Sequence, residues 1–142
     1  MNNISFIGMA GCGKSTIGGI LSSQLDISFV DTDFLIEEKF KLSLEQLKKK
    51  KGYEFVRQAE EEVILRLDEN IKVISTGGSA VYSEKSMLHL SSFSKIMYIK
   101  TPLDEIKQRI GDGQERGLAA PDDLSIDAVS YTHLTLPTIL RV

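Results

Sequence analysis

The sequence predicts an α/β fold of three layers, with a parallel sheet between two layers of helices. Two observations lead to this prediction. Short apolar runs of strand length alternate along the chain with stretches whose apolar residues fall at helical spacing. A glycine-rich segment, "GMAGCGKST" at 8–16, joins the first apolar run to the first helical stretch. Strands that alternate with helices pair in parallel, and both faces of such a sheet need covering.

In the first half of the chain, we expect a buried strand at 4–7 followed by a helix. The apolar stripe of that helix would be Ile17, Ile20, Leu21 and Leu25. A second strand covers 27–33 and runs into two aspartates. Ser43 and Gln46 form a capping box that opens a short helix, and the basic run at 48–51 is its solvated end.

In the second half, a long helix is predicted from Tyr53 to Asp68. Its apolar stripe consists of Val56, Ala59, Val63 and Leu67. Strands follow at 71–76 and 95–100, with a helix over about 84–92 between them. The last predicted helix covers Leu103–Ile110, because Thr101, Pro102 and Asp104 supply an N-cap, a first-turn proline and a capping-box acid.

Composition limits the function classes. The 142 residues, 42% of them apolar and 26% charged, suit one soluble domain with its own core. A net charge of −3 argues against nucleic acid as a partner, because nucleic-acid binders present a basic face. The single cysteine, Cys12, excludes an intramolecular disulfide and suits a reducing compartment. The N-terminus reaches Lys14 after a short apolar stretch, so we expect no signal peptide, no membrane span and a cytoplasmic location.

The glycine-rich segment predicts a phosphate site. Gly8, Gly13, Lys14 and Ser15 match the pattern G-x-x-x-x-G-K-[ST], with a strand before it and a helix after it. Glycines let successive N–H groups point at a phosphate, and the helix start adds its positive end. Lys14 would reach the outer phosphates of a nucleotide, and Ser15 would offer its hydroxyl to Mg²⁺. The nucleotide-binding residues are therefore Gly11, Cys12, Gly13, Lys14, Ser15 and Thr16, with Cys12 as a small filler rather than a redox centre.

The acceptor of the phosphoryl group should lie beyond the carboxyl ends of the other strands. Asp31 and Asp33 are by themselves as typical of a helix cap or a solvated turn. Beside a phosphate loop, one carboxylate can organise Mg²⁺ and the other can hold or deprotonate an attacking hydroxyl. Arg57 and Glu60, one helical turn apart, would by themselves be read as a surface ion pair. The glycines of "TGGS" at 76–79 allow either a close approach to a ligand or a plain turn.

Taken together, these motifs resemble the shikimate kinases over about residues 3–129. They are "GMAGCGKST", "DTD" at 31–33, Arg57-x-x-Glu60 in "FVRQAEEEV" and "TGG" at 76–78. The resemblance implies a P-loop kinase with a nucleoside-monophosphate-kinase-like sheet. It also implies an ATP-dependent transferase of aromatic amino acid biosynthesis, which phosphorylates a ring hydroxyl of shikimate to give shikimate 3-phosphate. The enzyme is expected to be a monomer that uses Mg²⁺ and binds neither nucleic acid nor membranes.

The resemblance also assigns roles to residues. Asp33 would bind the shikimate hydroxyls and assist the nucleophile, Arg57 would pair with the shikimate carboxylate, and Gly77 and Gly78 would present backbone to the same substrate. A bidentate guanidinium suits a carboxylate.

Two roles concern the nucleotide. Asp31 and Ser15 would order the Mg²⁺ shell, and Arg116 would come over the ATP phosphates on a mobile lid. The catalytic set implied by the resemblance is therefore Asp33, Lys14 and Arg116.

Three features depart from the family pattern. Ser79 stands where the family has a third glycine, and Arg116 leads into "GLAAPDDLS" instead of proline and leucine. The end of the chain, "VSYTHLTLPTILRV", has no match to the expected helix with a second carboxylate-binding arginine, the fifth strand or the final helix. The interpretation is an incomplete kinase domain at 1–129 and a non-native tail at 130–142. A four-stranded sheet with one uncovered edge would result.

Three alternatives stay open. The same phosphate machinery could act on a different small hydroxylated acceptor. A nucleoside-monophosphate kinase fits less well, since Asp33 and Arg57 suit a hydroxylated acid better than a base. The chain could also be a nucleotide-binding fragment without turnover.

Overall fold

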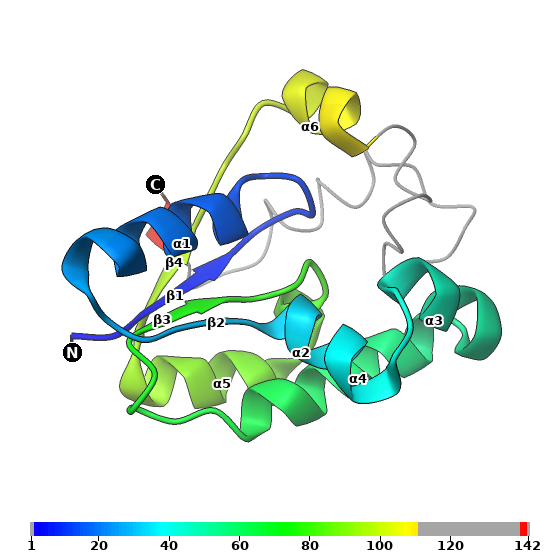
Figure 1. Ribbon diagram of the computed structural model, residues 1–142, viewed down its shortest axis with the longest axis horizontal. Helices are drawn as coiled ribbons and strands as arrows, with labels where there is room; N and C mark the ends of the chain where they lie inside the picture. Colours follow the sequence, from blue (N-terminus) through cyan, green and yellow to red (C-terminus); the bar gives the residue numbers. More distant parts are fainter. Residues whose placement is uncertain (1, 111–139, 142) are drawn as a thin grey trace.

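The sheet is parallel throughout, with its strands in the order β2-β3-β1-β4-β5, and the first four of these in the chain were predicted (Figure 1). This computed structural model describes residues 2–110 and 140–141. The four longer strands are β1 (Ile4–Ile7), β2 (Phe29–Asp31), β3 (Val73–Ser75) and β4 (Lys95–Tyr98). Because all strands run the same way, the segments that follow them gather at one edge of the sheet.

The edge beside β4 differs from the expectation. A short strand, β5 (Leu140–Arg141), pairs in parallel with Met97 and Tyr98. It comes from the end of the chain for which the sequence predicted no fifth strand. The edge is therefore covered over this length, and only the remainder of β4 matches the uncovered edge that we expected.

Helices cover both faces of the sheet, as predicted. In Figure 1, α1 lies on one face and α4 and α5 lie on the other. The elements in chain order are α1 (Lys14–Leu25), α2 (Thr32–Phe40), α3 (Leu44–Lys51), α4 (Tyr53–Leu65), the 3₁₀ turn η1 (Ala80–Tyr82), α5 (Glu84–Phe93) and α6 (Leu103–Ile110). Within the described ranges, no helix is long and apolar enough to cross a membrane.

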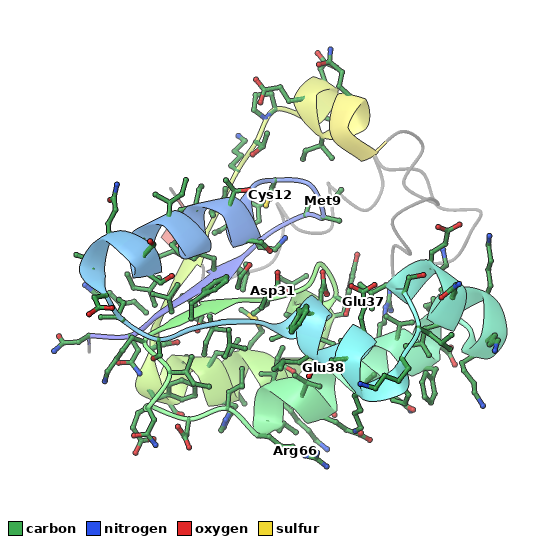
Figure 2. All side chains as sticks on the ribbon, in the orientation of Figure 1. Met9, Cys12, Asp31, Glu37, Glu38 and Arg66 are labelled. Carbon is green, nitrogen blue, oxygen red and sulfur yellow. The ribbon has the colours of Figure 1, made fainter. Side chains whose placement is uncertain are left out.

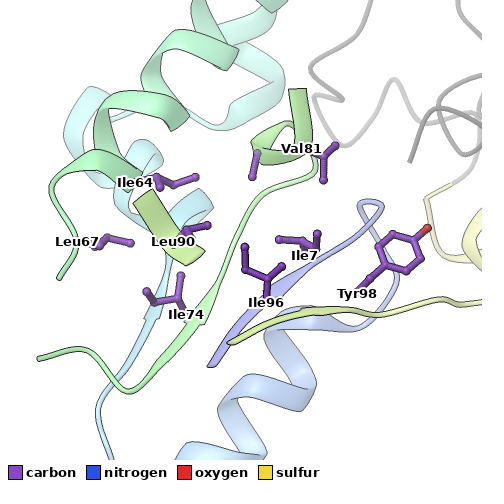
Figure 3. Close-up of a cluster of buried hydrophobic side chains, with 9 residues drawn as sticks. Ile7, Ile64, Leu67, Ile74, Val81, Leu90, Ile96 and Tyr98 are labelled. Carbon is purple, nitrogen blue, oxygen red and sulfur yellow. The ribbon is translucent and has the colours of Figure 1, made fainter. Parts of the chain in front are cut away.

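The core follows from the alternation of side chains along the strands. Successive residues of a strand point to opposite faces, so Phe6 and Val73 pack on the α1 side while Ile7 and Ile74 pack on the α5 side. Figure 3 shows the second of these clusters, in which Ile64 from α4 and Leu90 from α5 meet the strands. A third cluster joins α2, α3 and α4. These clusters fix the carboxyl edge of the sheet on both sides.

The predicted apolar stripe of α1 is wrong except for Leu21, which is partly buried and packs against the core. Ile20 and Leu25 are 55% and 58% exposed, whereas Gly18 and Ser22 are buried. The helix runs so close to the sheet that a Cβ on Gly18 would lie 2.7 Å from the Phe29 ring. Small residues therefore face the strands, and Ile17, Ile20 and Leu25 turn outward.

The region from 32 to 52 also differs in part. The second strand ends at Asp31, and the unpredicted helix α2 begins at Thr32, so Asp33 lies in a first helical turn. The capping box of Ser43 and Gln46 is confirmed, and the basic run is the last turn of α3. The apolar stripe predicted for α4 is buried as expected. The helix itself ends at Leu65, earlier than the predicted Asp68.

Candidate active site

The loops at the carboxyl edge of the sheet form the candidate site. Figure 2 shows Met9 and Cys12 on the loop after β1, and Asp31 at the junction of β2 and α2. Residues 76–79 follow β3, and the N–H of Gly77 donates to Thr32 Oγ1 at 2.9 Å, which ties this segment to the start of α2. Thr101, after β4, donates its hydroxyl to the carbonyl of Cys12 at 2.7 Å. Four strand ends are thus linked.

The loop after β1 has the backbone that a phosphate cradle requires. Gly8, Gly11 and Gly13 have φ values of 144°, 80° and 101°, a region that side-chain-bearing residues rarely adopt. Gly13 immediately precedes α1. The glycines therefore turn the chain into the helix, and the positive end of α1 faces the loop.

Lys14 lies inside this loop. Its side chain is buried, and its Nζ donates to the carbonyl oxygens of Gly8 and Met9, each at 2.6 Å. The Sγ atom of Cys12 is a third neighbour of the ammonium, at 3.6 Å. Cys12 is itself buried and packs in the core, which agrees with its interpretation as a filler. The ammonium is therefore held at the centre of the loop, where an anion would compete with two carbonyls for it.

Asp31 serves both as a helix cap and as a partner of the phosphate loop. Its Oδ1 accepts the N–H groups of Asp33 at 2.9 Å and Phe34 at 3.4 Å, which caps α2. Its Oδ2 accepts the hydroxyl of Ser15 at 2.5 Å. The predicted helix cap is therefore confirmed, and the second oxygen of the same carboxylate contacts the phosphate loop.

The Ser15 hydroxyl and Asp31 carboxylate are hard oxygen donors of the kind that Mg²⁺ takes. No group of three or more His, Cys, Asp or Glu that could hold a metal occurs in the part of the chain that the structure describes. One hydroxyl and one carboxylate fit Mg²⁺, because this ion keeps several waters and binds substrate phosphates. The chemistry of the pair is thus compatible with the predicted metal role.

A buried carboxylate, Glu60 of α4, organises the acceptor side. Glu60 is 2% exposed. Its Oε2 accepts the hydroxyl of Ser79, its Oε1 accepts that of Thr32 at 3.4 Å, and the backbone of Gly77 also donates to it. Glu60 therefore joins three segments, and the expectation of a surface ion pair is wrong for it. A buried carboxylate needs such donors, because burial without them costs several kcal/mol.

Gly77 has no space for a side chain. A Cβ at this position would overlap Asp33 Oδ1 and would lie 2.8 and 2.9 Å from the two oxygens of Glu60. Both carboxylates therefore approach the same point of backbone. The neighbouring Gly78 approaches the phosphate loop, since its Cβ would lie 3.4 Å from the N atom of Ala10.

The departure at Ser79 does not obstruct the site. Its side chain is 5% exposed and turns toward Glu60, away from the two cavities described below. From the sequence, Ser79 was expected to put a side chain where the family pattern has a third glycine. The structure uses that side chain as a hydrogen-bond donor for a buried carboxylate.

Two cavities meet at Asp33. The phosphate-loop cavity, about 740 Å³, is lined by residues 10–17, Asp33, Thr76 and Thr101, among others. All of the nucleotide-binding residues predicted between Gly11 and Thr16 line it. The acidic cavity, about 390 Å³, is lined by Asp31, Asp33, Glu37 and Glu45, together with Ala10, Ser15, Phe34, Ser43 and Leu44. Asp33 stands between a phosphate loop and a space with many hydrogen-bond acceptors.

Arg57 lies on the same helix as Glu60 but lines neither of these two cavities. Its guanidinium is half-buried and stacks on two tyrosine rings. The helix places it one turn before Glu60, beside the segment that follows β3. The sequence therefore predicted the helix that carries Arg57, but not the aromatic contacts of its side chain.

The two acceptor-side carboxyls have raised pKa values. Burial, with the charges of Glu60 and Asp31 added, raises the pKa of Asp33 to about 7, against the smaller opposing effect of Lys14. Burial also raises the pKa of Glu60, while the Ser79 hydroxyl and the Gly77 N–H oppose that rise. Asp33 is therefore poised to exchange a proton near neutral pH.

This shift predicts a pH dependence of stability. The pKa of Asp33 is higher in the folded chain than its ordinary value of 3.8, so its contribution is fully present below pH 3.8 and is lost as the pH rises through about 7. After discounting for the partial exposure of Asp33, we expect a loss of about 1–2 kcal/mol between pH 5 and pH 8. Asp33→Asn should remove most of this slope in melts at several pH values. An equal slope in the variant and the wild type would contradict the assigned pKa.

Sequence reasoning missed three polar participants: Thr32, Glu60 as a buried hub, and Thr101 as a support of the phosphate loop. Thr32 stands inside the "DTD" motif, which was a signal that could have found it. Arg116, predicted over the ATP phosphates, lies outside the described residues.

Comparisons with known proteins agree with the sequence motifs. Residues 10–133 match the family model for shikimate kinase. A shikimate kinase of Clostridium botulinum (strain Okra / Type B1) is 40% identical over 111 residues, which cover 78% of this chain and 65% of that protein. One from Staphylococcus aureus (strain JH9) is 34% identical over 113 residues, covering 80% of this chain and 65% of that protein. The matched part thus spans less than two thirds of the length of these relatives.

Solved structures agree with the fold. The crystal structure of a shikimate kinase from Aquifex aeolicus has a TM-score of 0.81 and 32% identity, and the match covers 99% of this chain and 85% of that one. A shikimate kinase from Acinetobacter baumannii in complex with shikimate has a TM-score of 0.76 and 29% identity, covering 87% of this chain and 69% of that one. The predicted P-loop kinase fold is confirmed.

Proposed function

The chain belongs to the shikimate kinase family, and from that premise we propose that it transfers the γ-phosphoryl group of ATP to a hydroxyl of shikimate. The observation that carries this proposal is the position of Asp33. Its carboxyl group lines both the phosphate-loop cavity and the acidic cavity. A group placed between a phosphate site and an acceptor space can act on the hydroxyl that attacks phosphorus.

The phosphate loop would hold the nucleotide. Its inward N–H groups and the start of α1 would bind the phosphates, and Lys14 would neutralise charge on the outer ones. Ser15 and Asp31 would hold Mg²⁺, which when bound offsets the negative charge of the phosphates. In the transfer, the bond from the γ-phosphorus to its bridging oxygen breaks and a bond to the acceptor oxygen forms. The hydroxyl proton passes to the carboxylate of Asp33.

The acceptor would lie against the segment after β3. The hydroxyls of shikimate would donate to Asp33, the backbone of Gly77 and Gly78 would contact the ring, and Arg57 would pair with the carboxylate. The many carboxylate oxygens of the acidic cavity support hydroxyl groups as ligands, since they can only accept hydrogen bonds when ionised. The lining of the acidic cavity holds carboxylates and no Lys or Arg, so in this proposal the substrate carboxylate pairs with Arg57, as the family resemblance implies.

The remaining parts of the proposal concern the whole protein. We propose a cytoplasmic monomer with no nucleic-acid or membrane partner, whose lid carries Arg116. We also propose that the kinase domain ends near residue 129 and that residues 130–142 are a non-native tail. A genomic clone that encodes this tail in frame would contradict the last point.

The experiment that tests the proposed function is thermal unfolding of this chain with Mg-ADP, with and without shikimate, followed by a turnover assay with ATP. A ligand that binds the folded state raises the Tm. We expect Mg-ADP to raise it and shikimate to raise it further. A rise with the nucleotide alone would favour another hydroxylated acceptor. Responses to both ligands without turnover would favour the nucleotide-binding fragment.

Arg57→Lys should separate the acid site from the nucleotide site. Lysine keeps the charge but cannot form two parallel hydrogen bonds to a carboxylate. We expect the Kd for shikimate to rise about tenfold, the order of one lost charge-assisted hydrogen bond, while the Kd for Mg-ADP stays within about twofold. Calorimetry with each ligand measures both. Equal losses for the two ligands would instead identify Arg57 as a structural residue.

A further inference from the structure

The guanidinium of Arg57 lies close to two aromatic rings from different elements. Its Cζ atom is 4.0 Å from the centroid of the Tyr82 ring and 5.0 Å from that of Tyr53. Tyr53 is the first residue of α4, one helical turn before Arg57, and Tyr82 is the last residue of η1. Both distances are within the range of cation–π contacts. The orientation of Arg57 is thus set by more than its own helix.

Stacking leaves the directional donors of the guanidinium in their plane. The five N–H groups of arginine point outward in the plane of the group, whereas an aromatic ring contacts its face. Two rings at these distances therefore restrict where the guanidinium can lie. A bidentate pair with a carboxylate needs a well-placed guanidinium, because two N–H groups must point at two oxygens at once.

Tyr82 also connects Arg57 to the glycine segment. Its N–H donates to the carbonyl of Ser79 at 3.1 Å, in the turn that directly follows Gly77 and Gly78. Ala80 and Val81 of the same turn are buried in the core. Burial raises the pKa of the Tyr82 phenol and Arg57 lowers it, which agrees with a contact between the two side chains. The ring is therefore anchored to the segment that presents backbone at the acceptor site.

We propose that Tyr82, with Tyr53, is a positioning residue that holds the guanidinium plane of Arg57 for the carboxylate of the acceptor. The inference rests on the proposed function, in which Arg57 pairs with that carboxylate. Tyr82 acts through Arg57 and does not touch the reacting atoms.

The test compares Tyr82→Leu, which removes the ring, with Tyr82→Phe, which keeps it. We expect Tyr82→Leu to raise the KM and Kd for shikimate about 3–10-fold, the range expected for one cation–π contact. Tyr82→Phe should stay within about twofold of the wild type, because it keeps the ring that lies beside Arg57. The kcat and the Kd for Mg-ADP should change little in both variants, and the Tm of each variant reports whether it folds.

The methyl ester of shikimate provides a second readout. The ester has no carboxylate, so Tyr82→Leu should weaken the binding of shikimate much more than the binding of the ester. The variant should therefore prefer the free acid over the ester less strongly than the wild type does. Equal weakening of acid and ester would show a general effect on the fold and overturn the inference. So would wild-type affinity in Tyr82→Leu, or a loss in Tyr82→Phe as large as in Tyr82→Leu. If wild-type protein binds Mg-ADP but not shikimate, the proposed function fails and the inference fails with it.

Discussion

Asp33→Asn is expected to lower the kcat for phosphoryl transfer by about 10²–10⁴-fold, the range lost with a general base. The amide keeps the shape of the side chain but cannot take a proton from the attacking hydroxyl. The same change should raise the Tm at pH 8, because it removes a carboxylate that burial and the Glu60 charge hold at a raised pKa. Lower activity with higher stability is the signature of a residue that serves the reaction at the expense of the fold.

Glu37→Gln is the matched control for this variant. Glu37 is another carboxylate of α2 that lines the acidic cavity, and its Oε2 accepts the N–H of Leu44 at 3.0 Å. A glutamine keeps an oxygen that can accept this bond, so we expect kcat within a few-fold of the wild type. Steady-state kinetics and melts on both variants provide the measurements. Undiminished turnover in Asp33→Asn would remove Asp33 from the mechanism, whether as a base or as the group that orients the hydroxyl.

Gly77→Ala is expected to damage the site more than any other single methyl group added to the described glycines of the acceptor side. The new Cβ would overlap Asp33 Oδ1 and lie within 2.9 Å of both Glu60 oxygens. Either the two carboxylates or the backbone after β3 must move, at a cost of about 1–3 kcal/mol for an overpacked interior. A lower Tm and a loss of most turnover should therefore occur together.

Two glycine controls identify the cause. Gly78→Ala, one residue later, would place its Cβ 3.4 Å from the N atom of Ala10, an ordinary contact, so its Tm should stay near that of the wild type. Gly19→Ala adds a methyl group to α1 with no atom within 4 Å. Because alanine is the better helix former, Gly19→Ala should raise the free energy of unfolding by up to about 1 kcal/mol. A Gly77→Ala protein as stable and active as Gly78→Ala would contradict the close approach of the two carboxylates.

Much of the fold could be predicted because its signals are local. The helix α6 begins at Leu103, where Thr101, Pro102 and Asp104 predicted it. The capping box at Ser43 closes within one turn of chain. By contrast, α2 was missed, because the "DTD" motif was interpreted as the end of a strand. Its cap, Asp31, serves the helix and the phosphate loop at once.

The candidate site divides in the same way. The phosphate loop could be predicted from sequence, since Gly8, Gly13, Lys14 and Ser15 act through adjacent backbone and one strand-to-helix turn. The resemblance also identified Asp33 and Arg57 as candidate site residues. It did not predict which side chains surround them. A charged residue such as Glu60 is predicted to be exposed unless its partners are known, and those partners come from residues 32 and 77–79.

The sequence was enough to predict most of the strands and helices in their order, the phosphate loop and the residue types available for transfer. These depend on periodicity, capping and glycine torsions, which act over a few neighbouring residues. Only the tertiary structure decided which face of α1 is buried, that Ser79 turns toward Glu60, and that Tyr82 stacks on Arg57. The physical reason is that burial and side-chain contact depend on the distance between elements remote in sequence. No local pattern encodes that distance.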